Sequence, residues 1–441
     1  MNNSIKLAIL GLGTVGTGVV HLLQDNLNEL KRRSGYNIVI SQVGTRKHRD
    51  DIDTSIKQTD DLFSICESDD VDIVIELIGG TTVAKDVITH AITHGKHVVT
   101  ANKALLAEHG NELFNLAEAN KVHVTYEASV AGGIPIIKVL RESLASNKID
   151  WLAGIINGTG NFIMTEMRDK GRSFADVLEE AQELGYAEAD PTFDVEGIDA
   201  AHKLALLASI AFGMPLAFDQ VYCEGITKIT TQDVEYAEDL GYRIKHLGLA
   251  VRRQQPDGTD AIELRVHPTL IPEDKLLASV NGVKNAVLVN SHPLGQSLYY
   301  GAGAGAGATA SAVVADVMDL IRVLNTDNNG HHVEHLSFQP ELLTDYKILS
   351  PEQITSGYYL RLHTEDHPGV LADVTRILSE SGINIDAILQ QPAHKAGHVP
   401  VIILTQPIIA QKMNQAIAQI EKLDTVTDEV VRIRLEELDE D

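Results

Sequence analysis

Residues 5–16 read IKLAILGLGTVG, an apolar run that ends in a G-x-G-x-x-G motif. The run predicts a buried β-strand, and the amphipathic stretch that follows, as far as Leu30, predicts a helix. At such a turn the first glycine permits the tight bend, the second lets a pyrophosphate approach the backbone, and the third lets helix and strand pack closely. This position favours a dinucleotide site over a glycine turn kept only for packing. The predicted cofactor-binding residues of the turn are Gly11, Gly13, Thr14, Val15 and Gly16.

Short β-rich runs alternate with helix-length segments as far as Tyr126. The stretch VDIVIELI at 71–78 is apolar on both faces, which is typical of a parallel sheet covered by helices on each side. Right-handed crossovers then make the sheet doubly wound. The fold class is therefore α/β, and we expect residues 1–130 to form a Rossmann-like NAD(P)-binding domain. Its strands are predicted at Lys6–Leu10, Ile38–Val43, Asp72–Leu77, His97–Thr100 and Val122–Tyr126.

The rest of the chain divides into two further predicted domains. Residues 131–325 change to helices followed by alternating segments, which predicts an α+β substrate domain. Its helices are expected around Ile134–Leu144, Ser173–Leu184, Asp194–Phe212 and Ala308–Leu324. The polar stretch TDNNGHHVEH begins a linker at 326–355. Residues 356–441 follow the order strand–helix–strand–strand–helix–strand, which is the ferredoxin-like arrangement.

Composition excludes several classes of protein. The chain has 441 residues with 36 Lys plus Arg against 62 Asp plus Glu, a net charge of −26, which repels nucleic acid and anionic lipid. Two cysteines are too few for a disulfide framework and fit a reducing compartment. The N-terminal run lacks the features of a signal peptide, and no apolar stretch is long enough to cross a bilayer. We therefore expect a cytoplasmic protein with neither nucleic acid nor membrane as a partner.

The exit of the second strand bears on the choice of cofactor. An NAD-specific site usually places Asp or Glu there, whereas this chain has Arg46 and Lys47. The two cations could receive a 2′-phosphate, or they could be solvated loop charges. We expect NADP to be used at least as well as NAD.

Asp199 and Lys203 lie four residues apart on one predicted helix. At an exposed position they would be an ordinary ion pair. The helix, AAHKLALLASIAF at 200–212, is apolar almost all round, so its lysine is expected to face a cavity or a partner and to exchange protons. Lys103 closes a strand at the sheet edge where ligands bind, and Glu188 lies in an acidic turn before the helix. Each of these two residues could equally be solvated.

Other reactive residues are weaker candidates. Neither cysteine is expected to be a nucleophile, because Cys66 lies in the helical run DLFSICES at the rim of the first domain and Cys223 in VYCEGI has no histidine nearby. His331, His332 and His335 lie in a hydrophilic linker without carboxylates at ligand spacing, which disfavours a metal site. The run GAGAGAGATA at 301–310 is either a spacer or a backbone approach to the cofactor.

Several motifs, taken in their order, resemble the homoserine dehydrogenase family over about residues 5–325. They are Gly11–Gly16, Glu76–Gly80, Thr100–Lys103, Tyr126–Pro135, Gly154–Thr159 and Gly197–Lys203. The C-terminal stretches Asp366–Leu371 and Gly382–Ile385 resemble an ACT domain, an amino-acid-sensing unit. The alternatives are a semialdehyde dehydrogenase, which needs a poised thiolate, and a non-catalytic dinucleotide-binding sensor.

The resemblance implies the interconversion of L-homoserine and L-aspartate 4-semialdehyde with NADP or NAD, a step toward threonine and methionine. Lys203 would donate the proton, Asp199 would orient the substrate or its lysine partner, and Lys103 would place the reacting oxygen and contact the cofactor. Glu188 would hold the substrate's amino group, and Gly303 would approach the cofactor.

The resemblance also implies a sodium ion, an effector and an oligomer. Sodium would be bound by the Glu127 region and by the carbonyls of Val130, Gly132 and Ile134. The ACT-like module implies feedback inhibition, most simply by threonine, near Gly369 and Asn384. A homo-oligomer, a dimer or a tetramer, is implied, with dimerisation through the middle domain.

Overall fold

The computed structural model describes residues 4–324, 333–390 and 398–439, and the chain forms two compact units. The first unit contains Met1–Gly158, Asp199–Val221 and Val283–Tyr346, and the second contains Thr159–Ile198, Tyr222–Gly282 and Lys347–Asp441. Each unit is therefore built from segments that are distant in sequence. The predicted boundaries at residues 130, 325 and 355 are not the boundaries of these units and remain predictions.

A parallel sheet forms the N-terminal part of the first unit, and its strand order is β3-β2-β1-β4-β5-β6. The order reverses between β1 and β4, which is where ligands bind in a doubly wound sheet. The predicted fold class is confirmed, with one short strand, β3, added at the edge. The strands are β1 (Ser4–Leu10), β2 (Asn37–Gly44), β3 (Lys57–Thr59), β4 (Ile73–Glu76), β5 (His97–Thr100) and β6 (Val124–Thr125).

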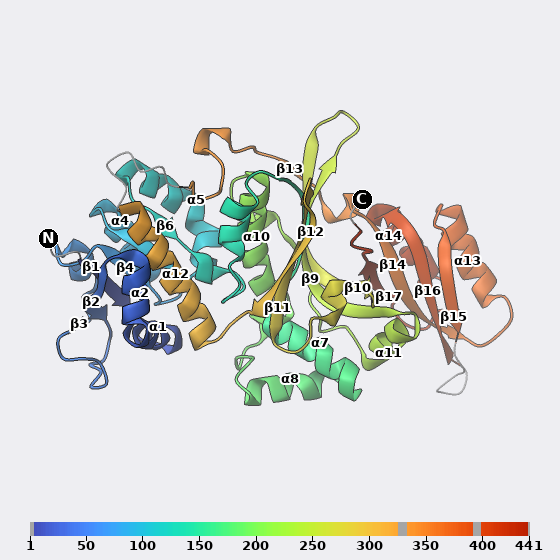
Figure 1. Cartoon of the computed structure of the whole chain (residues 1–441). Coiled ribbons are helices and arrows are strands. Elements are labelled where there is room, and N and C mark those ends of the chain that lie inside the picture. The colour runs from blue at the N-terminus through green and yellow to red at the C-terminus, as the bar shows by residue number, and fades with distance from the viewer. Residues whose placement is uncertain (1–3, 325–332, 391–397, 440–441) are drawn as a thin grey trace. The chain divides into compact units, whose positions relative to one another are not determined.

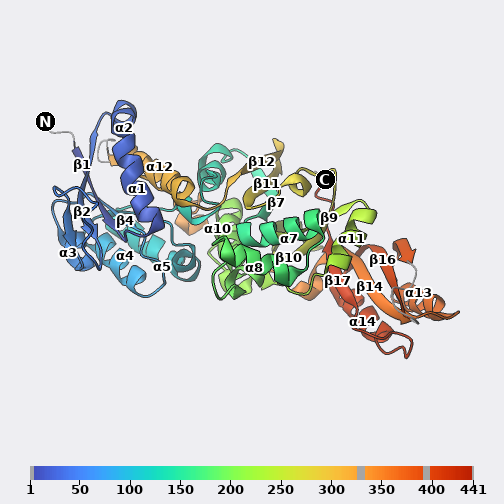
Figure 2. The same cartoon turned by 90° about the horizontal axis from the view of Figure 1, so that it is seen from below.

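Helices cover both faces of this sheet (Figure 2). One face carries α1 (Thr14–Asp25), α2 (Leu27–Ser34) and α12 (Ala306–Leu324), and the other carries α3 (Leu62–Glu67), α4 (Val83–Thr93) and α5 (Lys103–Asn120). Helix α12 lies beside α1 although the two are far apart in sequence (Figure 1), because buried side chains of both join one core with β1. The segment after the glycine run therefore completes the dinucleotide-binding fold.

The remainder of the first unit includes an antiparallel sheet of β7 (Lys148–Ile155), β11 (Lys284–His292) and β12 (Gly295–Ala302). The predicted helix Ile134–Leu144 is only a short α6 (Ile136–Lys138) continued by a π-helical turn at Val139–Ser143. The predicted helix Asp194–Phe212 breaks at Gly197, whose φ of +86° ends α9 (Thr192–Val195) before α10 (Ile198–Phe212) begins. Every residue of α10 from Asp199 onward is buried, as its apolar sequence predicts.

The second unit joins middle segments to the C-terminal module. Its strands run in the order β9-β10-β17-β14-β16-β15, with β8 and β13 also paired to β10. The last four strands in this order form an antiparallel sheet with the ferredoxin-like arrangement. The middle segments form α7 (Gly158–Lys170), α8 (Phe174–Glu183), α11 (Thr231–Asp239), β8 (Tyr222–Cys223), β9 (Tyr242–Gln254), β10 (Asp260–Pro272) and β13 (Lys347–Ile348). The C-terminal module forms β14 (Thr355–Glu365), α13 (Val370–Glu380), β15 (Ile385–Gln390), β16 (His398–Ile409), α14 (Ala410–Ile420) and β17 (Val431–Leu435).

None of the helices described in the structure is both long enough and apolar enough to cross a membrane.

A buried ion pair joins the C-terminal module to α11 within the second unit. Arg361 donates from Nε to Asp233 Oδ1 at 2.6 Å and from Nη2 to Asp233 Oδ2 at 3.0 Å, and Tyr359 donates its hydroxyl to the same carboxylate. Asp233 is 0% exposed, so removing its partner would leave an uncompensated buried charge.

We therefore expect Arg361→Met to lower the free energy of unfolding by about 3–5 kcal/mol, measured by urea denaturation of the full-length protein. The control is Arg376→Met, whose exposed pair with Asp373 is worth at most about 1 kcal/mol. Equal effects of the two substitutions would contradict the prediction.

Candidate active site

The glycine turn is held by close backbone contacts. Gly11 has a φ of +98°, its N–H donates to the carbonyl of Gly44 at 3.0 Å, and a Cβ on it would lie 2.6 Å from the Leu77 oxygen. A Cβ on Gly16 would lie 2.0 Å from the Gly11 oxygen. Gly13, by contrast, is exposed, and a Cβ there would meet nothing within 4 Å. The turn is thus fixed on its inner side and open where a pyrophosphate would approach the N-terminus of α1.

The loop after β2 carries three cations, one of which contacts the turn. Arg46 and Lys47 are exposed and follow Gly44, which contacts Gly11. Arg49, which no sequence pattern singles out, donates from Nη1 to the Leu12 carbonyl at 3.0 Å and pairs with Asp51 through Nε and Nη2. Its position next to the turn could not be predicted from the sequence, because it depends on how the loop folds back onto Leu12.

The glycine run at 301–310 leads to a close contact with α1, the helix that follows the turn. A Cβ on Gly18 of α1 would lie 3.0 Å from the oxygen of Ala306, the first residue of α12. Gly303, the predicted cofactor contact, is instead tightly packed: a Cβ there would lie 2.1–2.3 Å from the side chain of Asn285. Gly305 and Gly307 are exposed and face open space, so these two positions have more room for a close approach than Gly303 has.

A carboxylate between two ammonium groups lies in the same unit. Asp199 Oδ2 accepts from Lys203 Nζ at 2.6 Å, and Asp199 Oδ1 lies 3.2 Å from Lys103 Nζ. Asp199 is 4% and Lys203 is 9% exposed, whereas the Lys103 side chain is one-third exposed. Three of the residues predicted from the sequence are therefore brought together.

Backbone and side-chain groups hold this cluster in place. Lys203 also donates to the carbonyl of Ile156 at 2.7 Å, and the Asn157 amide donates to Asp199 Oδ2 at 2.8 Å. Lys103 begins α5 directly after β5, where the Asn102 side chain accepts from the Leu105 N–H. The sequence pattern indicates no role for Asn157, although this residue falls within the motif Gly154–Thr159.

Opposing effects determine the charge of this cluster. Burial would raise the pKa of Asp199, but the charges of Lys203 and Lys103 and the hydrogen bonds from Lys203 and Asn157 lower it to about 2. Burial also lowers the pKa of His202 to about 4, with a contribution from Lys103. Asp199 is therefore ionised and His202 neutral at neutral pH, so the cluster can accept and orient hydrogen-bond donors and can present ammonium protons to an oxygen.

Glu188, the predicted substrate ligand, belongs to the second unit. It is exposed in the turn between α8 and α9, and its carbonyl accepts from the Gln182 side chain at 3.0 Å. Its role stays a prediction.

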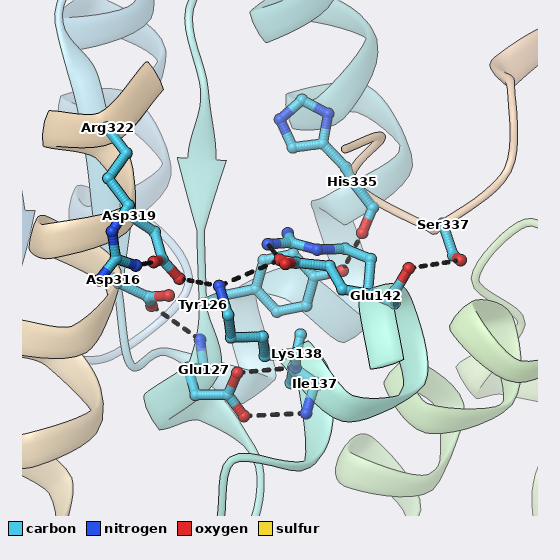
Figure 3. Close-up of polar contacts among 11 residues, drawn as sticks. Tyr126, Glu127, Ile137, Lys138, Glu142, Asp316, Asp319, Arg322, His335 and Ser337 are labelled. Atoms are coloured by element: carbon cyan, nitrogen blue, oxygen red, sulfur yellow. Dashed lines mark hydrogen bonds and ion pairs between the residues drawn. The ribbon is translucent and has the colours of Figure 1, made fainter. Parts of the chain in front are cut away.

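The loop predicted to bind sodium is held in place by hydrogen bonds of Glu127. The two carboxylate oxygens of Glu127 accept from the N–H groups of Ile137 and Lys138, each at 2.8 Å, and the Glu127 N–H donates to Asp316 (Figure 3). Burial raises the pKa of Glu127 to about 7 despite the two backbone hydrogen bonds. This carboxylate is therefore already bonded on both oxygens.

The carbonyls of this loop have fewer partners. Ala131 and Gly132 have φ of +52° and +53°, which turns the chain sharply between Val130 and Ile134. The Ile134 carbonyl accepts from Ile136 at 2.8 Å. Among the residues that the structure describes, nothing donates to the carbonyls of Val130 and Gly132, and both residues are buried. Carbonyl oxygens are ligands that suit hard cations.

The C-terminal module contains a cavity of about 350 Å³ at the N-terminus of α13. Gly369, with a φ of +104°, is the N-cap of α13 and lines the cavity. Asn384 is not among the lining residues, and its side chain bonds Gln406 at 3.1 Å. The residues that line the cavity are Thr364, Glu365, Asp366, His367, Pro368, Gly369, Val370, Leu371, Gln390 and Val401.

Cys66, Cys223 and His335 are the weaker candidates that the structure describes. Burial raises the pKa of Cys66 and of Cys223 to about 11, so both are thiols rather than thiolates. His335 accepts from the Val124 N–H at 3.1 Å and stacks on Phe114. His331 and His332 lie outside the described residues.

Comparisons with known proteins agree along the whole chain. Residues 11–127 match the family model of the homoserine dehydrogenase NAD-binding domain, 135–318 match the homoserine dehydrogenase model, and 358–422 match the ACT domain. Homoserine dehydrogenase of Pseudomonas aeruginosa is 56% identical over 98% of this chain and 99% of its own length.

Two solved structures are also similar. A homoserine dehydrogenase from Thiobacillus denitrificans has a TM-score of 0.93 and 53% identity, covering 99% of both chains. A hyperthermophilic archaeal homoserine dehydrogenase in complex with NADPH has a TM-score of 0.60 and 25% identity over 72% of this chain and 97% of that one.

The lowered pKa of Asp199 predicts how stability depends on pH. A carboxyl with a folded-state pKa of about 2, below its ordinary 3.8, stabilises the fold above about pH 4, and this contribution is lost as the pH falls through 2. The advantage in unfolding free energy of the wild type over Asp199→Asn should therefore shrink by about 1.5 kcal/mol between pH 5 and pH 2.5.

Urea denaturation across this pH range measures the difference. Asp219→Asn, at an exposed position in the same unit, is the matched control, and its unfolding free energy should depend on pH in the same way as that of the wild type. If the unfolding free energy of Asp199→Asn depended on pH in the same way as that of the wild type, the ionised state of Asp199 would be ruled out.

Proposed function

The chain belongs to the homoserine dehydrogenase family of NAD(P)-dependent oxidoreductases, and we propose that it interconverts L-aspartate 4-semialdehyde and L-homoserine on the way to threonine and methionine. The observation that carries this proposal is the buried Asp199 carboxylate between Lys103 and Lys203, in the same unit as the open glycine turn. A scaffold that only sensed a dinucleotide would have no need of this cluster. A semialdehyde dehydrogenase with a thiolate nucleophile is disfavoured by the raised pKa values of both cysteines.

Each residue of the cluster has its own role in the proposed reaction. When bound, the nicotinamide cofactor supplies or accepts the hydride. In the reducing direction Lys203 donates a proton to the aldehyde oxygen as the alcohol forms, and Lys103 stabilises the negative charge that develops on that oxygen. Asp199, ionised and bonded by Asn157, holds the ammonium of Lys203 in place. Glu188 binds the substrate's amino group.

The cofactor is bound by the turn residues Gly11–Gly16 and by α1, with Lys103 nearby. Arg46 and Lys47 are exposed at the strand exit, where an NAD-specific site usually has an acid for the ribose 2′-hydroxyl. Arg49 also lies beside the turn, but its guanidinium is paired with Asp51. This arrangement favours NADPH at least as much as NADH, in line with the relative whose structure contains NADPH. The first test is the initial rate of oxidation of each cofactor with L-aspartate 4-semialdehyde. Absence of turnover with both would overturn the proposal.

Sodium binds in the loop 127–134 in this proposal. The support is that the Val130 and Gly132 carbonyls, in a buried turn, have no donor in the described part of the chain. Glu127 contributes by fixing the loop through its bonds to Ile137 and Lys138.

Threonine regulates the enzyme through the C-terminal cavity in this proposal. Glu365 and Asp366 can pair with the ammonium of an amino acid, and the N-terminus of α13 can receive its carboxylate. Asn384, which does not line the cavity, is the second residue of the proposed effector region, at the interface between the subunits of a dimer or tetramer. The acidic surface and the scarcity of cysteine support a cytoplasmic location.

Removing the proton donor tests the chemistry. Lys203→Ala should lower kcat by about 100-fold or more, in line with general acid–base contributions, while the KM for NADPH stays near that of the wild type. The control is Lys228→Ala, an exposed lysine, which should leave kcat unchanged. A kcat within a factor of two of the wild type would remove Lys203 from the mechanism.

Changing the cavity tests the regulation. Asp366→Ala should abolish inhibition by millimolar threonine and leave the basal rate unchanged, because the effector's ammonium loses its partner. Asp386→Ala, an exposed acid on β15 outside the cavity, should keep the response. Equal threonine inhibition of both variants would place the effector site elsewhere.

A further inference from the structure

Two histidines and a glutamate of the first unit face one another on α3 and α4. His90 and His94 are four residues apart at the C-terminal end of α4, and Glu67 is the last residue of α3. His90 Nε2 lies 3.0 Å from Glu67 Oε1, and the two imidazole centroids are 4.1 Å apart. One possible ligand atom of each residue lies within 4.8 Å of the others. The cluster contains the donor types of a transition-metal site and is separate from the proposed catalytic residues.

Packing fixes the two helices that carry these side chains. Ile65 and Cys66 of α3 are buried, and the Cys66 thiol contacts the carbonyl of the buried Val87 on α4. The last turn of α3 and the last turn of α4 are therefore held side by side by the core, so a metal would not have to bring them together.

The histidine rings are also oriented. His94 Nδ1 lies 2.8 Å from the His90 carbonyl, a contact that makes Nδ1 the protonated nitrogen and leaves Nε2 as the ligand atom. The ring of His90 is in edge contact with Phe63, with centroids 5.2 Å apart and an interplanar angle of 89°. A hydrogen bond from one imidazole to a backbone carbonyl is the usual way in which a metal-binding histidine is held.

We propose that Glu67, His90 and His94 bind one Zn²⁺ ion, with water as the fourth ligand. Two imidazole nitrogens and one carboxylate oxygen suit Zn²⁺ and disfavour Mg²⁺ and Ca²⁺, which take oxygen ligands. In a tetrahedral site with bonds of about 2.0–2.1 Å the ligand atoms are about 3.3 Å apart. Rotation of the exposed Glu67 and His94 side chains closes the spacing of up to 4.8 Å to this value.

The site lies away from the cofactor. Crossover helices run antiparallel to the strands of a parallel sheet, so the C-terminal ends of α3 and α4 lie at the edge opposite the glycine turn. The ion would clamp α3 to α4 and stabilise the first unit without taking part in turnover. The proposal is thus independent of the proposed reaction.

The test is a zinc titration of the full-length protein after treatment with a chelator. We expect the wild type to bind one Zn²⁺ per chain more than His94→Gln does, with micromolar affinity in calorimetry, and to gain several degrees in Tm at saturating zinc while the variant gains none from this site. The matched control is His48→Gln, a highly exposed histidine of the same sheet domain, which should bind as the wild type does. Co²⁺ provides a second probe, because its visible spectrum reports tetrahedral coordination.

The results of the zinc titration distinguish a real site from none. The three side chains are partly or largely exposed, so His94→Gln and Glu67→Gln are expected to fold, which the metal-free Tm verifies. A wild type with no zinc bound at 100 µM would overturn the proposal, as would equal stoichiometry in the wild type and His94→Gln. Loss of one zinc per chain and of the Co²⁺ spectrum in His94→Gln, with initial rates unchanged, would establish it.

Discussion

Asp199 is a buried carboxylate, and two lysines and an asparagine offset the free-energy cost of removing its charge from water. Burial alone would favour its neutral form, and the pKa of about 2 shows that the ion pairs and hydrogen bonds outweigh desolvation. Keeping these partners in place requires α10 to be buried from Asp199 onward, the residues just after β7 to present the Ile156 carbonyl and the Asn157 amide, and α5 to begin at Lys103. Three distant segments of the first unit are therefore arranged around one charge.

The dinucleotide turn sets a second, steric constraint on the same unit. Gly11 and Gly16 have no room for a side chain, and Gly18 brings α1 against the start of α12. Helix α12 is the last element before residues 325–332, yet it completes the face of the first sheet (Figure 2). The glycine run at 301–310 is placed beside the turn by this return of the chain rather than by any local property of the run.

In the second unit, the C-terminal module is continuous with strands from the middle of the chain. β17 pairs with both β10 and β14, Arg361 pairs with Asp233, and Arg265 of β10 bonds Glu436 at 2.6 Å. Buried charges that span the two segments are destabilising unless both partners stay in register. The cavity at the start of α13 is therefore connected to β10 and α11 by fixed contacts within one unit.

Local patterns in the sequence determined the parts of the protein that depend on neighbouring residues. The glycine turn, the alternation of strands and helices and the ferredoxin-like order of the last 86 residues follow from periodicity and turn chemistry, and the structure contains them. The helical spacing of Asp199 and Lys203 likewise placed them on one face. Only the tertiary structure decided which distant groups meet: Arg49 on the glycine turn, Asn157 on Asp199, Asn285 against Gly303, and Glu67 beside His90. It also decided that Gly197 breaks the helix before Asp199. These contacts depend on how separate elements pack, and no spacing along the chain encodes that.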